Sequence, residues 1–82
     1  MKEEIKKKVD PAIEKLDMHV SSVYTEKVDG VVNLNIELDS DKVIDTERIT
    51  EASRIINDII DEMDIPMEGY ILDIHSKEKG EN

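Results

Sequence analysis

Hydrophobic positions between Asp45 and Ile74 recur first at the spacing of a helix and then at the spacing of a strand. Up to Met63 they come three or four residues apart, so they form one stripe along a helix that faces a core. After Asp64 the segment Ile65–Gly69, which contains a proline, interrupts this pattern, and apolar residues then alternate with others. The stretch therefore predicts a helix, a short loop and a strand. The helical positions are Ile49, Ala52, Ile56, Ile59, Ile60 and Met63, and the strand positions are Tyr70, Leu72 and Ile74.

The segment from Val31 to Asp39 has the clearest strand pattern in the chain. Apolar and polar residues alternate along it, which predicts one buried face and one face that meets water. Asp29 and Gly30 precede it, and this pair favours a tight hairpin turn because both residue types tolerate a positive φ. We expect helices to cover only the apolar face. The expected core positions are Val32, Leu34, Ile36 and Leu38, and the expected water-facing positions are Asn33, Asn35, Glu37 and Asp39.

The N-terminal part of the chain predicts a helix over residues 2–16 and a strand over residues 18–27. Pro11 leaves two possibilities for the helix: it bends at the proline, or it begins there with Asp10 as the N-cap. In the strand, the apolar residues change phase around residues 21–22, which is typical of a β-bulge. The apolar residues are Ile5, Val9, Ala12, Ile13 and Leu16 in the helix, and Val20, Val23 and Tyr24 in the strand.

These elements predict an α+β fold with the order α-β-β-α-β. It is a two-layer sandwich in which two helices cover one face of a three-stranded mixed sheet. The second helix, capped by Asp45 or Thr46, joins the second and third strands, so the right-handed crossover rule makes these strands parallel. The lateral order of the strands stays open. We expect one domain over residues 1–76 and a solvated tail over residues 77–82.

The chain is acidic: its 82 residues include 21 Asp and Glu against 11 Lys and Arg, a formal charge of -10. This charge repels phosphate backbones, so it disfavours charge-driven nucleic-acid binding, and it attracts basic protein surfaces. The chain has no cysteine, which excludes disulfides and thiolate chemistry. No apolar run is long enough for a signal peptide or a membrane span. We therefore expect a cytoplasmic protein with no membrane partner.

The sequence offers no pattern typical of a catalytic or cofactor-binding site. No serine lies in a Gly-flanked nucleophile motif, and the three glycines are too far apart to form a phosphate-binding loop. His19 and His75 lack metal-ligand spacing, and Asp39, Asp41 and Asp45 lack the pattern of a calcium loop. We expect surface and capping roles for these residues, with no metal, no cofactor and no enzymatic activity.

An ungapped pattern runs through the second half of the chain: Ala52-Ser53-Arg54, Ile60-Asp61, Asp64 and Tyr70–Ile74. This pattern resembles the N-terminal domain of the bacterial ribosome maturation factor RimP. The likeness extends back to Asp39, which ends the second strand, and to residues 11–20, where Asp17 stands at the place of a family glycine. After Ser76 the family continues with Pro-Gly into an Sm-like barrel domain, whereas this chain continues with Lys77 and Glu78.

The resemblance implies a non-catalytic protein that binds the immature small ribosomal subunit and assists its late assembly. It also implies a basic ribosomal protein as the neighbouring partner, which agrees with the acidic charge of the chain. Because they match the family pattern, five residues are candidates for partner binding: Asp39, Ser53, Arg54, Asp61 and Tyr70.

Three of these residues also have purely structural explanations. Ser53 is small enough to let its helix approach the sheet, and Arg54 can pair with Asp58 one helical turn away. Tyr70 can bury its ring and leave its hydroxyl in water. For the whole protein, the alternative is a stand-alone acidic protein-interaction domain that serves another basic partner.

Overall fold

The computed structural model describes residues 2–66 and 68–77. It contains the predicted elements in the predicted order, which confirms the α+β fold. Residues 78–82 of the expected tail lie outside the described residues, whereas the N–H of Lys77 donates to the C=O of Leu38 at 2.6 Å. The elements are α1 (Lys2–Ile13), the 3-10 helix η1 (Glu14–Leu16), β1 (His19–Val28), β2 (Val31–Asp39), α2 (Thr46–Glu62) and β3 (Ile71–Ser76).

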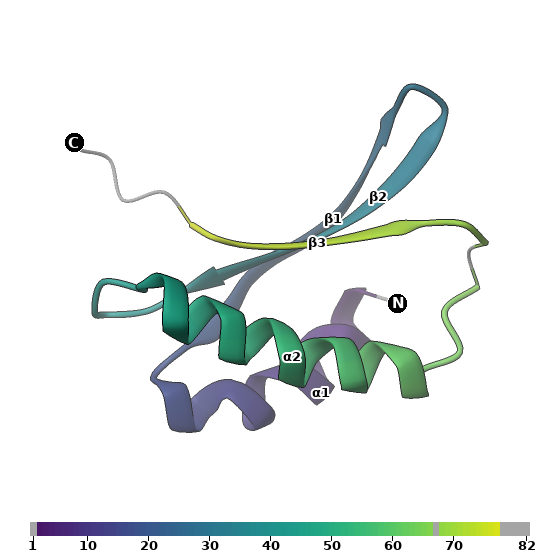
Figure 1. Cartoon of the computed structure of the whole chain (residues 1–82). Helices are drawn as coiled ribbons and strands as arrows, with labels where there is room; N and C mark the ends of the chain where they lie inside the picture. Colours follow the sequence, from purple (N-terminus) through teal and green to yellow (C-terminus); the bar gives the residue numbers. More distant parts are fainter. Residues whose placement is uncertain (1, 67, 78–82) are drawn as a thin grey trace.

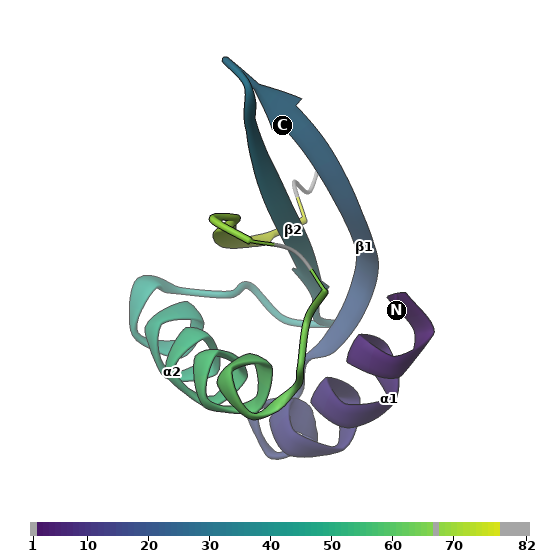
Figure 2. The same cartoon turned by 90° about the vertical axis from the view of Figure 1, so that its right-hand side faces the viewer.

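The sheet has the strand order β1-β2-β3, so β2 is the central strand. It pairs antiparallel with β1 and, as predicted, parallel with β3. Both helices lie on the same side of this sheet, and the tip of the β1–β2 hairpin extends away from them (Figures 1 and 2). The lateral order, which the sequence left open, follows from the crossover through α2 that returns the chain to the free side of β2.

The core lies between the sheet and the two helices. Of the four predicted core positions of β2, Leu34, Ile36 and Leu38 are confirmed as fully buried, whereas Val32, close to the hairpin turn, is only half-buried. Leu72 and Ile74 of β3 pack against the core from its margin and are partly buried. The remaining fully or nearly fully buried apolar residues are Ile5, Val9, Ile13, Met18, Val20, Val23, Ala52, Ile56 and Ile60.

Helix α1 continues through Pro11, so the alternative in which Asp10 caps a helix that begins at the proline is wrong. The helix begins at Lys2, and its first turns place Ile5 and Val9 in the core. The burial of these two side chains offsets the hydrogen bond that the proline nitrogen cannot donate. The α-helix ends at Ile13, earlier than predicted, and η1 takes up the last three residues.

The turn after η1 depends on Asp17, which stands where the resembled family has glycine. Asp17 adopts a left-handed conformation, with φ 59 and ψ 37, and its N–H donates to the C=O of Glu14 at 2.9 Å. Aspartate is among the few residues with a side chain that tolerate this conformation. The departure from the family pattern therefore keeps the turn.

Both predicted irregularities of the hairpin are confirmed. The register of β1 against β2 shifts between Val20 and Ser22, which makes Ser21 the extra residue of a bulge. Asp29 and Gly30 have φ values of 51 and 81, as a two-residue primed turn requires. The strand itself covers residues 19–28, one position later than predicted.

The connection from β2 to α2 is fixed by side-chain oxygens that accept backbone hydrogen bonds. Asp39 accepts from the N–H of Ser40 at 2.8 Å. Asp45 is the N-cap of α2 and accepts from the N–H of Arg48 at 2.9 Å, which decides between the two predicted caps. The guanidinium of Arg48 bonds the C=O groups of Val43 and Leu16, so the start of α2 is tied to the end of η1.

Candidate partner-binding surface

The sheet face opposite the helices, here called the open face, carries most of the polar side chains of the strands. Because β2 buries Leu34, Ile36 and Leu38 against the helices, its alternate residues point to the other side. The register then places their partners on β1 and β3 on the same side. The open face consists of Ser22, Tyr24, Glu26, Val28, Val31, Asn33, Asn35, Glu37, Ile71, Asp73 and His75.

His75 is the centre of the densest polar cluster on the open face. Its Nδ1 lies 3.5 Å from a carboxylate oxygen of Asp73, and its Nε2 lies 3.9 Å from one of Glu37. Its ring meets the ring of Tyr24 edge-on, with the centroids 6.4 Å apart. The cluster therefore draws on all three strands and presents two carboxylates beside an aromatic pair.

Asn35 contradicts the prediction that every polar residue of β2 meets water, because it is only 4% exposed. The reason is its central position: Tyr24 lies opposite it on β1 and Asp73 lies opposite it on β3. Its amide donates to the C=O of Asn33 at 3.3 Å, which supplies a hydrogen-bond partner for the buried group. The middle of the open face is therefore packed, although no helix covers it.

Apolar side chains gather at the hairpin end of the open face. Val28 and Val31 are paired across the turn and are 48% and 37% exposed, and Ile71 on β3 is 53% exposed. Such a group of exposed aliphatic residues next to carboxylates suits contact with a protein surface rather than with a small polar molecule.

Three of the predicted site residues lie on α2. Arg48 and the residues around Met63 mark the side of α2 that faces α1, because Arg48 bonds the Leu16 carbonyl and Met63 shares a hollow with residues of α1. Ser53 and Asp61 lie away from that side, on a ridge that also contains Asn57. The Asn57 amide donates to the Ser53 carbonyl at 2.8 Å within this ridge. We call Ser53, Asn57 and Asp61 the outer flank of α2.

Ser53 is half-buried and Asp61 is exposed. Arg54, the third of these residues, is exposed, and the structure shows no ion pair between its guanidinium and Asp58, although both residues are described. The predicted structural explanation for Arg54 is therefore wrong.

The other two predicted residues lie at opposite ends of the sheet. Tyr70 directly precedes β3, and its half-buried side chain packs against the core, as its structural explanation requires. Asp39 ends β2 opposite His19, whereas the start of β3 pairs with Asn33. Asn33 and Asp39 lie six positions apart along β2, a span of about 20 Å. The structure therefore brings Tyr70 close to one end of the sheet and leaves Asp39 apart.

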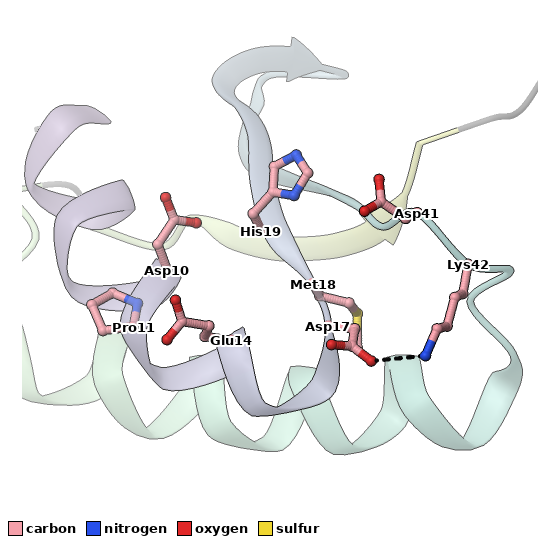
Figure 3. A pocket seen from close by; sticks show the side chains of 8 residues that line it. All are labelled: Asp10, Pro11, Glu14, Asp17, Met18, His19, Asp41 and Lys42. Carbon is pink, nitrogen blue, oxygen red and sulfur yellow. Dashed lines mark hydrogen bonds and ion pairs between the residues drawn. The ribbon is translucent and has the colours of Figure 1, made fainter.

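A second acidic surface lies beside η1, where a hollow of about 570 Å³ opens between α1, the start of β1 and the loop after β2. Figure 3 shows its side chains, with Asp17 and Lys42 joined at 3.2 Å. Asp10 is committed to other contacts, because it accepts from the Val20 N–H and pairs with Lys6. The lining residues are Asp10, Pro11, Glu14, Asp17, Met18, His19, Asp41 and Lys42.

Neither surface has the composition of a metal centre. Within residues 2–66 and 68–77, no three His, Cys, Asp or Glu side chains are placed to hold an ion together. His19 and His75 lie on different strands, opposite Asp39 and Glu37 respectively. In the same described part of the chain, no helix is long and apolar enough to cross a membrane.

Sequence reasoning did not find the cluster around His75. Its members are spread over residues 24–75, and only the strand register brings them together. The signal available in the sequence was the alternation itself, which places Glu37, Asp73 and His75 on the side of their strands away from the apolar residues. Combining it with the parallel pairing of the second and third strands would have placed these residues on one face.

Comparisons with known proteins match the architecture described above. No curated protein gives a significant match. A family model described as the RimP N-terminal domain matches residues 8–77, a range that contains all three strands, α2 and the second half of α1. This range also contains every residue of the pattern from Ala52 to Ile74. The chain therefore belongs to the RimP N-terminal domain family, a family of ribosome maturation factors.

Proposed function

We propose that this protein binds the small ribosomal subunit without catalysing a reaction and assists its late assembly, with a basic ribosomal protein as its direct partner. The family match over residues 8–77 carries this proposal. We also propose that residues 1–76 form one domain and that the protein works in the cytoplasm, where ribosomal subunits are assembled.

The distribution of charge supports a basic protein partner. The chain has a formal charge of -10, so a bare phosphate backbone is repelled and a cationic protein surface is attracted. Glu26, Glu37 and Asp73 lie on the open face, where exposed aliphatic residues accompany them. Carboxylates next to apolar side chains suit a partner that presents Lys or Arg together with hydrophobic contacts.

We propose that the five residues singled out from the sequence contact the partner from two separate parts of the molecule. Ser53 and Asp61 lie on the outer flank of α2, Arg54 is exposed next to it, and Tyr70 lies at the start of β3. Asp39 lies at the far end of the sheet, so a partner that contacts it in addition must extend along β2.

Sucrose-gradient sedimentation of cell lysate tests the proposal directly. The tagged chain is expected to sediment with free small subunits and to be depleted from mature ribosomes. At high salt it should dissociate from the subunits, because salt screens charged contacts. Recovery only in the soluble top fraction, with no subunit-bound material at low salt, would contradict it. That result would favour the stand-alone interaction domain with another basic partner.

A charge-matched control separates specific binding from general attraction. An unrelated acidic domain of similar size and charge, carrying the same tag, is sedimented in parallel. If this control enters the subunit fraction to the same extent as the chain, the association reflects net charge alone and the proposal fails.

A further inference from the structure

The two edges of the sheet differ in how their outward backbone groups are satisfied. On β1, the N–H of Val20 donates to Asp10 Oδ1 at 2.6 Å, and the C=O of Val20 accepts from Lys6 Nζ at 3.0 Å. At Val20, two side chains of α1 thus take the place of a neighbouring strand; within the described residues, no other outward backbone group of β1 is bonded. The bulge at Ser21 follows, and farther along the same edge Lys27 adds a positive charge. Bulges and lysines are common means of closing a sheet edge.

The outer edge of β3 has no such closure. The bond from the Lys77 N–H to the Leu38 C=O fixes the alternation of the ladder, so Leu72, Ile74 and Ser76 direct their N–H and C=O groups away from β2. Within the described ranges 2–66 and 68–77, no hydrogen bond reaches these outward groups. The strand also contains no proline, lysine or bulge.

Acidic and apolar side chains border this free edge on both sides. On the open face, the Asp73 side chain is 56% exposed and Ile71 is 53% exposed. On the opposite side lies the outer flank of α2, because α1 occupies the other side of that helix (Figure 2). Asp61 on this flank is exposed. Exposed carboxylates are thus present both on the open face, at Asp73, and on the outer flank of α2, at Asp61.

We propose that β3 accepts an extended basic segment of a partner protein as a fourth strand of the sheet. Hydrogen bonds to the outward groups of Leu72, Ile74 and Ser76 supply the main-chain pairing that strand addition uses. Because side chains of an added strand alternate between the two faces, its basic residues reach Asp73 on one side and Asp61 on the other.

The inference rests on the proposed function, in which the partner is a basic protein of the small subunit. It adds the position and the manner of binding, and it gives Ser53, Asp61 and Tyr70 a common location beside one edge. Pairing of the β3 edge with a second copy of the chain is disfavoured, because two molecules that each carry a charge of -10 repel one another.

Amide hydrogen exchange measured residue by residue, on the whole chain alone and bound to purified immature small subunits, tests the manner of binding. In the complex, the exchange rates of the amides of Leu72, Ile74 and Ser76 are expected to fall by a factor of about ten or more. The amide of Val20, which Asp10 already bonds, serves as the internal control and should keep its rate. Unchanged exchange at the three β3 amides in a formed complex would overturn the inference and leave the proposed function intact.

A pair of charge reversals tests the position. Asp73→Lys and Glu51→Lys each replace one negative by one positive charge, so both change the formal charge from -10 to -8. Asp73 borders the β3 edge, whereas Glu51 is exposed on α2, outside both the open face and the outer flank. Asp73→Lys is expected to weaken subunit binding by about tenfold and Glu51→Lys by less than about twofold. Equal effects would overturn the assignment to β3.

Two further outcomes remain distinguishable. If the unaltered chain does not bind subunits at all, the proposed function fails and the inference fails with it. If the three β3 amides become protected in the free chain as its concentration rises, and a dimer appears in sedimentation, the edge belongs to a second copy and the inference is overturned.

Discussion

The two faces of the central strand β2 differ in what determines them. On the covered face, Leu34, Ile36 and Leu38 are all fully buried, as their alternation predicted. On the open face, the polar residues have no such uniform environment: Asn35 is 4% exposed, whereas Asn33 is half-buried. The difference shows that sequence periodicity determines which side chains are buried on the covered face, whereas neighbours on adjacent strands determine how exposed each side chain is on the open face.

The largest effect that tests this difference comes from deleting the same side chain on each face. Ile36→Ala is expected to lower the free energy of unfolding by about 2–5 kcal/mol, because the Ile36 side chain is fully buried in the core. Ile71→Ala, on the open face, should lower it by less than about 1 kcal/mol. Urea unfolding followed by circular dichroism measures both. Similar losses for the two variants would mean that the open face also holds the fold.

An intermediate effect is expected from the two asparagines of β2. Asn35→Ala should cost about 1 kcal/mol, because the buried amide loses its hydrogen bond to the Asn33 carbonyl. Asn33→Ala removes a similar bond, to the Val31 carbonyl, from a half-buried residue whose bond lies at the surface, and should cost a few tenths of a kcal/mol. The same unfolding measurement ranks them. A greater loss for Asn33→Ala would show that central burial does not decide the cost.

The sequence was sufficient for those parts of the fold that depend on neighbouring residues. The alternation of β2, the Asp29–Gly30 turn and the N-cap Asp45 are each set by local chemistry. Pro11 was ambiguous because the local rule for proline competes with burial of Ile5 and Val9, and only the tertiary structure shows that burial prevails. The strand order and the burial of Asn35 depend on pairing between distant segments.

For the candidate site, the sequence supplied residues without their arrangement. The pattern from Ala52 to Ile74 singled out Ser53, Asp61 and Tyr70, and the structure places them along α2 and at the start of β3. The unpaired edge beside them is a property of topology, since it exists only because β3 lies on the outside of β2. For the same reason, the cluster of Tyr24 and His75 was not foreseeable from either strand alone.

The smallest effect separates the two histidines. His75→Ala should lower the free energy of unfolding by about 0.5–1 kcal/mol, because it removes the edge-on contact with Tyr24. His19→Ala, at an exposed position on β1, should leave the unfolding midpoint unchanged. Thermal unfolding at one fixed pH compares them. Indistinguishable midpoints for the two variants would show that the cluster on the open face adds nothing to stability.

The hydrogen bonds from α1 to Val20 also fix the register of the hairpin. Asp10 and Lys6 hold the N–H and C=O of one residue, directly before the bulge at Ser21. A slip of β1 by one position would offer a different residue to these two side chains and would turn Val20 and Val23 out of the core. Through these two contacts, helix α1 determines which side chains of β1 point into the core and which point to the open face.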